Sequence, residues 1–491
     1  MKTKNSPGAS LSEGGKTHPR GTLHTLSEFR REAGIPLVIA KKMVVWGEVK
    51  AVKIAGGTVR ITEEEVQRVR KIFENPREKV KYYLRILGPG IITGASDDDP
   101  SGIGTYSSVG AMFGFAILWT AAWLLPVMFA IQEVSARIGI VANHGLANVI
   151  QKHYGKKIVL GIVSILIIAN VVNIGADLGA MAASLKMLTG IDVSLAAVSF
   201  ALIIIFIEIF FQYHVYVKVL KWLTLSVFAY IFAGIIASPN WGEVLANTFV
   251  PKIYWNENYI FALIAIFGTT VTPYLFFWQT SEEVEENKLL KIKSDKRTLC
   301  TRVREMRTDV GAGMLLANIV FFFIIVTTAQ VLFKNGITNI GSAEQAALAL
   351  KPLVGNFAYA LFALGIIGTG LLAIPILAGS GAYALSEVMK WREGLELKFS
   401  RAKGFYLIIA FSIIVGLLIN FIGIEPIKAL YYSAYLNGII ALPLLIAIMI
   451  VGNDKRIMGA ETHPLWVKIF GWLAVVFMFG AIAATILLAF K

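Results

Sequence analysis

The chain has 491 residues, of which 56% are hydrophobic and 16% charged, with a formal net charge of +14. Soluble domains carry about 25% charged residues, so this composition excludes an ordinary soluble protein and indicates a membrane protein. The single cysteine, Cys300, excludes an internal disulfide and a metal site built from several cysteines. Basic residues lie between the apolar stretches, as in cytoplasmic loops, so we expect no nucleic-acid partner.

The N-terminal region, residues 1–80, is polar and basic, and we expect it to be cytoplasmic, without a secretory signal, and mostly disordered over 1–42. Residues 44–61 alternate loosely around two glycines and predict a short hairpin. Thr62, followed three positions later by a glutamate, predicts a capping box before a basic amphipathic helix that ends near Pro76. A membrane-surface helix and a solvated helix both remain open for this segment.

Eleven apolar stretches follow, each long enough to cross a bilayer, which takes roughly 20 residues. They lie at 86–113, 115–139, 157–186, 193–212, 217–237, 258–282, 311–334, 355–388, 404–421, 427–451 and 465–489. The loops that share a side with the N-terminus are rich in Lys and Arg, whereas 238–257 and 335–354 are poor in them. We therefore expect a multi-pass protein of the cytoplasmic membrane, with the N-terminus cytoplasmic, the C-terminus outside and a monomeric state.

The first and sixth stretches are interrupted by helix breakers near their middles. The first contains Asp99-Pro100-Ser101-Gly102, and the sixth contains Thr272-Pro273. Broken helices at corresponding positions of two repeats are typical of the binding sites of transporters. We predict an all-α fold with one five-helix repeat over 86–237, a second over 258–451 and an eleventh helix over 465–489.

Three consecutive aspartates, Asp97, Asp98 and Asp99, lie inside the first apolar stretch. One carboxylate at the centre of a bilayer costs about 2.5–3.5 kcal/mol, so the triplet, with Ser101 beside it, predicts a site for a cation. The alternative is that the triplet faces water at the membrane surface. In the sixth stretch, Thr269 and Thr272 offer oxygen donors, which suit Mg²⁺, Mn²⁺ or Ca²⁺, unless they bond back to their own helix.

Polar groups in other spans are candidates for gating or proton relay. Asn173 and Asp177 are four residues apart in the third span, on one helical face. An aspartate inside a membrane is a candidate for a relay, while the asparagine serves equally well as an interhelical hydrogen-bond partner. Tyr274 and Gln279 of the sixth span complete this group of candidates.

Further charged residues are interpreted as structural or solvated. Glu133 and Arg137, four apart in the second span, predict a structural pair. Three residues near span ends are expected at the surface: Glu208, His214 and Glu387. The glutamates after the sixth span are expected to be solvated, with gating of the inner exit by Glu282 or Glu283 as the alternative.

Three stretches resemble the Nramp family of divalent metal transporters: Gly88-Pro89-Gly90, Asp99-Pro100-Ser101-Gly102 and Gln132 to Asn148. The resemblance implies a leucine-transporter-type fold with metal between broken helices 1 and 6. The family's Asp-Pro-Gly-Asn retains only its aspartate and proline here. Its Met-Pro-His-Asn is replaced by Thr272-Pro273-Tyr274-Leu275, and the glutamate of its Asp-Leu-Ala-Glu by Ala180.

Asn437 stands in the tenth span, where the family often has an amide. A thioether favours transition metals over Mg²⁺, so the missing methionine removes that discrimination. The chain is thus similar to the divergent, Nramp-related magnesium transporters. The missing histidine and glutamate argue against strong proton coupling, with replacement of these groups by Asp97 or Asp98 as the alternative.

No phosphate-binding loop of the ATPase type is present, so we expect a secondary transporter and not an enzyme, with no cofactor apart from the transported ion. The leading hypothesis is import of Mg²⁺ or Mn²⁺ by alternating access, weakly coupled or uncoupled to protons. The alternative is a proton-coupled symporter of Mn²⁺ or Fe²⁺. An organic-solute transporter and a metal sensor rank lower.

Overall fold

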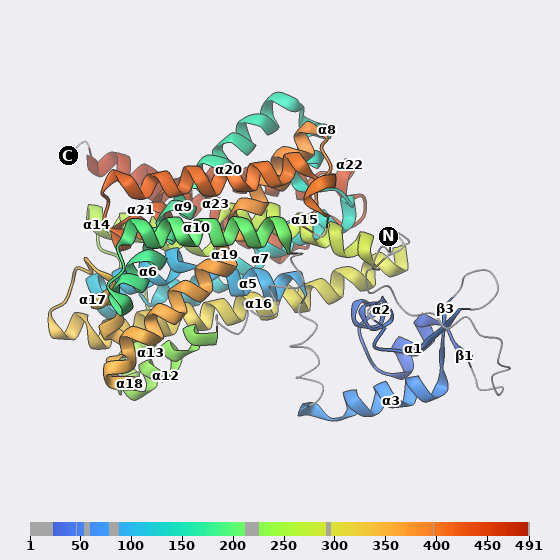
Figure 1. The fold of residues 1–491 in the computed structure, drawn as a ribbon, viewed down its shortest axis with the longest axis horizontal. Coiled ribbons are helices and arrows are strands. Elements are labelled where there is room, and N and C mark those ends of the chain that lie inside the picture. The colour runs from blue at the N-terminus through green and yellow to red at the C-terminus, as the bar shows by residue number, and fades with distance from the viewer. Residues whose placement is uncertain are drawn as a thin grey trace, which may run out of the picture. The chain divides into compact units, whose positions relative to one another are not determined.

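The fold is described from a computed structural model covering residues 23–45, 47–53, 59–77, 88–211, 225–290, 296–395 and 397–489. The chain divides into two compact units (Figure 1). One unit contains the N-terminal region together with Glu285–Asp309, and the other contains Pro89–Val284 and Val310–Lys491. The helices α15 and α16 contribute residues to both units.

The N-terminal region is a small α/β fold. Its elements are β1 (Leu23–His24), α1 (Leu26–Glu32), α2 (Leu37–Val45), β2 (Ala51–Lys53), β3 (Val59–Thr62) and α3 (Glu63–Glu74). The strands form an antiparallel sheet in the order β1-β3-β2, which confirms the predicted hairpin between β2 and β3. Apolar side chains of the three helices and of β3 form one buried core. Among them are Phe29, Ile61, Val66 and Val69.

Two expectations for this region are wrong. Residues 23–42, expected to be disordered, form β1, α1 and most of α2, because Phe29, Ile39 and Met43 supply an apolar core that the polar composition concealed. The helix expected after Thr62 does begin at Glu63, but the Thr62 side chain makes no capping hydrogen bond. A complete capping box is found instead at Thr25 and Glu28.

The second unit is a bundle of apolar helices. They are α5 (Pro89–Asp97), α6 (Pro100–Phe113), α7 (Trp119–Ala142), α8 (Leu146–Tyr154), α9 (Lys156–Thr189), α10 (Val193–Phe210), α12 (Ala229–Ile236), α13 (Trp241–Phe249), α14 (Glu257–Thr270), α15 (Pro273–Leu289), α16 (Lys296–Val331), α17 (Ala343–Ala347), α18 (Lys351–Val354), α19 (Ala358–Met389), α20 (Lys403–Ile419), α21 (Pro426–Asn453), α22 (Lys455–Met458) and α23 (Leu465–Ala489). Within this bundle α9 packs against α10, α19, α20 and α21 (Figure 1).

Nine helices in the described part of the chain are long and apolar enough to cross a membrane. The first predicted span is absent from these nine because it is broken into two helices, α5 and α6, each too short to be counted. The fifth predicted span, 217–237, falls partly outside the described residues, and α12 is its described helix. The all-α polytopic fold expected from the sequence is otherwise confirmed.

Glycines allow the broken helices to approach their neighbours closely. A Cβ atom on Gly94 of α5 would lie 2.3 Å from the carbonyl oxygen of Gly313 in α16. A Cβ atom on Gly268 of α14 would lie 2.0 Å from the carbonyl oxygen of Ala434 in α21. Small residues at such crossings let helix backbones pack against each other in a membrane, and here they hold both breaks in place.

Candidate functional site

The break in the first span lies at the aspartate triplet. Asp97 ends α5, and Asp99 is the N-cap of α6, where its Oδ1 accepts a hydrogen bond of 2.7 Å from the Gly102 backbone N–H. Pro100 then takes the first helical position, which suits its fixed φ angle and missing N–H. All three aspartates are buried, with 1%, 6% and 2% of their surface exposed, which contradicts the surface interpretation.

Asp99 connects three helices at this break. Its Oδ2 accepts a hydrogen bond of 3.2 Å from the Asn173 side chain of α9 and one of 3.4 Å from the Tyr274 hydroxyl of α15. The Tyr274 hydroxyl also lies 3.0 Å from the carbonyl oxygen of Ser96, at the unwound end of α5. Asn173 is held in turn by the Ser433 hydroxyl of α21, at 3.0 Å. Three of the predicted site residues therefore meet at one carboxylate.

Several buried polar atoms around this carboxylate have no hydrogen-bond partner among the described residues. They are both carboxylate oxygens of Asp97 and of Asp177, one oxygen of Asp98 and the Ser101 hydroxyl. The amide nitrogen of Asn437 in α21 is also buried without a partner among the described residues. The Asp177 carboxylate of α9 lies near Asp99 and the Ser101 backbone. Burying an ionised carboxylate without a partner is strongly unfavourable, so the chemistry of this group suits a cation or protons.

The second break, at Val271 and Thr272 between α14 and α15, contributes less than the sequence predicts. The Thr272 hydroxyl donates to the Thr269 carbonyl oxygen at 3.0 Å, as the alternative interpretation expected. Thr269 is closer to the first break, because a Cβ atom on Gly102 would lie 3.4 Å from its hydroxyl oxygen. The carbonyl oxygens of Thr269 and Thr272 at this break accept hydrogen bonds from the Thr272 hydroxyl and the Leu275 backbone N–H.

A second polar chain lies one turn further along α15. The Gln279 side chain accepts from the Thr93 hydroxyl at 2.5 Å and donates to the Glu283 carboxylate at 2.9 Å. Gln132 of α7 lies 3.5 Å from the same Gln279 oxygen. Thr93 and Gln132 were not predicted; their polar side chains within apolar stretches were the signal.

The comparisons with known proteins agree with this architecture. A family profile described as "Natural resistance-associated macrophage protein-like" (Nramp) matches residues 90–488. This chain belongs to the Nramp family. It is therefore a multi-pass membrane protein of a transporter family and not an enzyme, and the N-terminal region, residues 23–77, precedes the part that defines the Nramp match.

Two curated Nramp relatives have similar coverage. The "Divalent metal cation transporter MntH" of Klebsiella pneumoniae is 25% identical over 413 residues, 83% of this chain and 94% of that protein. The protein of the same description from Caldanaerobacter subterraneus is 25% identical over 415 residues, 82% and 92%. A crystal structure of the Eremococcus coleocola manganese transporter has a TM-score of 0.67 and 20% identity, and covers 83% of this chain and 87% of that one. That likeness shows that the fold is shared.

Four glutamates that the sequence predicted to be exposed are buried in the structure. Glu208 and Glu387, expected at the surface, have 1% and 4% exposure, and Glu387 accepts from the Asn148 backbone at the start of α8 at 2.8 Å. Glu283 and Glu286, expected to be solvated, are also buried. Their positions near span ends did not reveal the neighbouring helices that cover them. His214 lies outside the described residues.

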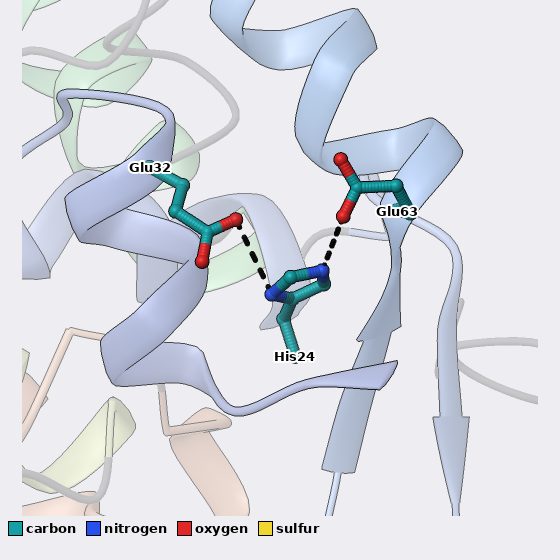
Figure 2. A group of neighbouring side chains, drawn as sticks. All are labelled: His24, Glu32 and Glu63. Carbon is teal, nitrogen blue, oxygen red and sulfur yellow. Dashed lines mark hydrogen bonds and ion pairs between the residues drawn. The ribbon is translucent and has the colours of Figure 1, made fainter. Parts of the chain in front are cut away.

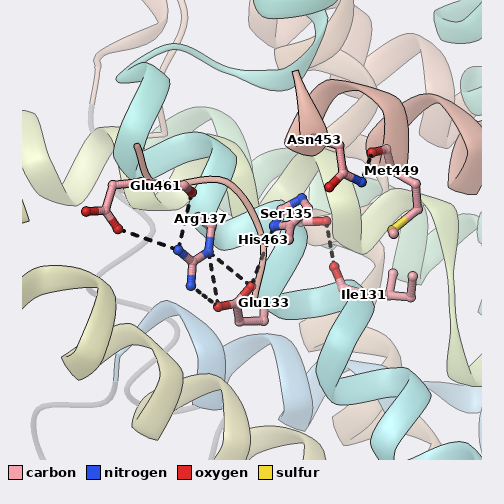
Figure 3. Close-up of polar contacts among 8 residues, drawn as sticks. All are labelled: Ile131, Glu133, Ser135, Arg137, Met449, Asn453, Glu461 and His463. Carbon is pink, nitrogen blue, oxygen red and sulfur yellow. Dashed lines mark hydrogen bonds and ion pairs between the residues drawn. The ribbon is translucent and has the colours of Figure 1, made fainter. Parts of the chain in front are cut away.

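A paired cluster at one end of α7 confirms the predicted contact between Glu133 and Arg137. The Arg137 guanidinium donates from Nε to Glu133 Oε1 at 3.1 Å, and its Nη1 donates to the Glu461 carbonyl oxygen at 3.3 Å (Figure 3). His463 Nδ1 lies 4.0 Å from Glu133 Oε2. His463 stands between α22 and α23, where burial lowers its pKa to about 4, so it is neutral at pH 7.

Proposed function

We propose that this protein carries a divalent metal ion, Mg²⁺ or Mn²⁺, across the cytoplasmic membrane by alternating access, with weak or no coupling to protons. Membership of the Nramp family supports this class of substrate, and the curated relatives are described as divalent metal cation transporters. Broken helices at the site support transport by alternating access, because unwound backbone is tolerated inside a membrane where it lines a pathway.

The observation that carries the proposal is the buried group of carboxylates at the junction of α5 and α6. Asp99 is held in place by Gly102, Asn173 and Tyr274, whereas the oxygens of Asp97 and Asp177 have no partner in the described chain. A dication entering this group would neutralise charges that nothing else there compensates. We assign ion binding to Asp99, Asp98, Asp97 and Ser101, with Thr269 and Thr272 as lesser contributors.

The donor chemistry supports a hard ion. Carboxylate, hydroxyl and carbonyl oxygens are the donors at both breaks, and Thr272 stands where the family has a methionine. Mg²⁺ and Mn²⁺ prefer oxygen, and Mg²⁺ keeps several of its waters when bound. We assign gating or relay roles to Asn173, Asp177, Tyr274, Gln279 and Asn437.

A proton-coupled symporter of Mn²⁺ or Fe²⁺ is the second candidate, and one observation favours it. A Cβ atom on Gly370 of α19 would lie 2.4 Å from Sδ of Met181 in α9 and 3.3 Å from Cγ of Pro100. Gly370 thus leaves room for a buried thioether beside the start of α6, one turn beyond Asp177. A sulfur atom near the site would restore some preference for transition metals.

The orientation and organisation complete the proposal. We place the N-terminus in the cytoplasm and the C-terminus outside, on the distribution of basic residues in the loops. Two inverted five-helix repeats followed by α23, acting within a single copy of the chain, remain our prediction for the architecture of transport.

The test is influx of Mg²⁺ and of Mn²⁺ into proteoliposomes that contain a pH-sensitive dye. We expect influx of both ions without acidification, and its loss in Asp99→Ala. Glu257→Gln, which removes an exposed carboxylate at the start of α14, is the control and should transport normally. Normal influx in Asp99→Ala would overturn the proposed site. Mn²⁺ influx with acidification, and none of Mg²⁺, would select the second candidate.

A further inference from the structure

Three side chains that could hold a metal ion converge in the N-terminal unit, outside the helix breaks. His24 Nε2 lies 2.5 Å from Glu63 Oε2, and His24 Nδ1 lies 3.3 Å from Glu32 Oε2. One donor atom from each residue can be chosen so that all lie within 4.8 Å of one another. Figure 2 shows the imidazole ring between the two carboxylates, each of which points toward it.

The scaffold holds the three residues in place from three different elements. His24 ends β1, and the pairing of β1 with β3 sets it opposite Ile61, two residues before Glu63 at the start of α3. The capping box at Thr25 fixes the beginning of α1, whose last residue is Glu32. The backbones of the three residues are thus held close together, and an ion that binds has to displace the carboxylate at one ring nitrogen and draw both carboxylates to itself.

Exposure makes the group accessible. The His24 side chain is 12% exposed, while those of Glu32 and Glu63 are 44% and 39% exposed. The imidazole is therefore fixed, and the carboxylates border solvent, which permits an ion to enter and to keep water in its remaining positions.

The donor set indicates which ion fits. One imidazole nitrogen and two carboxylate oxygens suit divalent transition metals such as Mn²⁺ and Fe²⁺, whereas Mg²⁺ prefers oxygen alone. We propose that His24, Glu32 and Glu63 bind a divalent transition-metal ion and that this ion regulates transport. The regulatory part rests on the proposed transport function, and the binding part does not.

A route for regulation exists within the same unit. The backbone N–H groups of Leu37 and Val38 donate to the Glu305 carboxylate of α16, at 2.5 and 3.2 Å. Lys42 Nζ lies 2.6 Å from Glu286 Oε1 of α15, where Arg302 also pairs, and all three charges are buried. α15 is one helix from Pro273 to Leu289, so the helix that carries Tyr274 and Gln279 ends among these contacts.

This arrangement gives the direction of the effect. An ion that joins β1, α1 and α3 makes the N-terminal unit more rigid. This unit also contains the end of α15 and the start of α16. Alternating access requires rearrangement of the broken helices, so a more rigid N-terminal unit, which contains the end of α15, opposes that rearrangement. A site with three protein ligands fills when the ion accumulates on its own side of the membrane. Mn²⁺ on the side of the N-terminal unit should therefore slow uptake.

Binding is tested on the full chain in detergent by counting bound Mn²⁺ from the loss of the free-ion signal in electron paramagnetic resonance. The wild type should bind two ions and Asp99→Ala one. Adding Glu63→Gln to Asp99→Ala should weaken that remaining binding at least about tenfold. Glu64→Gln, the same charge change at the exposed neighbouring residue of α3, should leave it unchanged.

Each outcome separates the two proposals. Equal Mn²⁺ binding by Asp99→Ala with and without Glu63→Gln would overturn the new site and leave His24 as an ion-paired histidine. Loss of one ion in Glu63→Gln but none in Asp99→Ala would support the new site and count against the proposed transport site. His24→Gln should repeat the result of Glu63→Gln, and a failure to do so would also overturn the site.

Regulation is tested in proteoliposomes by adding Mn²⁺ to the side of the N-terminal unit during uptake. The wild type and Glu64→Gln should slow by at least about threefold, and Glu63→Gln should not respond. Slowing of Glu63→Gln to the same extent as the wild type would overturn the regulatory part. Mg²⁺ at the same concentration should slow none of them, and equal slowing by Mg²⁺ would overturn the choice of a transition metal.

Discussion

Two regions of the helical bundle bury ionisable side chains in different ways. At one end of α7, Glu133 and Arg137 are paired, and the guanidinium also reaches the Glu461 carbonyl. At the junction of α5 and α6, the carboxylates of Asp97 and Asp177 are buried without a hydrogen-bond partner in the described chain. Both regions carry ionisable groups inside apolar stretches, yet only the first supplies its own countercharge.

The difference separates structural charge from functional charge. A paired charge stabilises the fold only while both partners remain, because removal of one leaves the other buried and uncompensated. A group of unpaired carboxylates persists when the protein uses it to attract an ion or protons. Variants in the first region should therefore change stability, and variants in the second should change the response to metal.

The largest effect is expected at the paired cluster. Arg137→Leu removes the guanidinium that pairs with the buried Glu133 carboxylate and should lower the free energy of unfolding by about 3–5 kcal/mol. Thermal unfolding in detergent measures it. The double variant Glu133→Gln with Arg137→Leu should recover most of the loss, and equal losses in the single and double variants would contradict this account.

A pH dependence follows from His463 in the same cluster. Burial lowers its pKa to about 4, below the usual value of about 6.5, so the unfolded chain takes up the proton first as the pH falls. Stability from the neutral ring is complete above pH 6.5 or so and is lost toward pH 4, by about 3 kcal/mol in total. His463→Gln should flatten the profile of unfolding temperature against pH across this window; an unchanged profile would assign the effect to other groups.

Metal should stabilise the unpaired region. At a concentration of Mn²⁺ about one hundred times its Kd, binding should raise the free energy of unfolding by about 2.7 kcal/mol. The measurement is best made in the Glu63→Gln background, where only the junction of α5 and α6 binds the ion. Adding Asp99→Ala should remove the increase, and an equal increase in that variant would place the ion elsewhere.

The smallest effect concerns selectivity. Met181→Leu preserves the volume beside Gly370 and removes the sulfur near Pro100. If the thioether contributes to selectivity, the ratio of Mn²⁺ to Mg²⁺ influx should fall by about threefold, with Mg²⁺ influx unchanged. An unchanged ratio would restrict selectivity to the oxygen donors. Met128→Leu, a buried methionine of α7, serves as the control.

The sequence alone predicted the features that depend on residues close to one another in the chain. Hydropathy located most of the spans, and Pro100 and Pro273, each beside small or polar residues, located both helix breaks. Proline alone does not break a helix here, because Pro126, Pro375 and Pro443 lie inside continuous helices. Local reasoning also identified Asp99, as a carboxylate inside an apolar stretch, and the pair of Glu133 with Arg137, one helical turn apart. Amphipathic spacing likewise located α3.

Tertiary structure decided which polar groups find partners. Asp99 meets Asn173 and Tyr274 at sequence separations of 74 and 175 residues, and no local pattern encodes such contacts. Glu208 and Glu387 look solvated in sequence because burial depends on neighbouring helices. Residues 23–42 were grouped with the polar and basic sequence before them, yet Phe29 and Ile39 complete a core with Val66 and other residues further along the chain. Composition and helix breakers act within a few residues, whereas burial and pairing depend on contacts that only the folded chain creates.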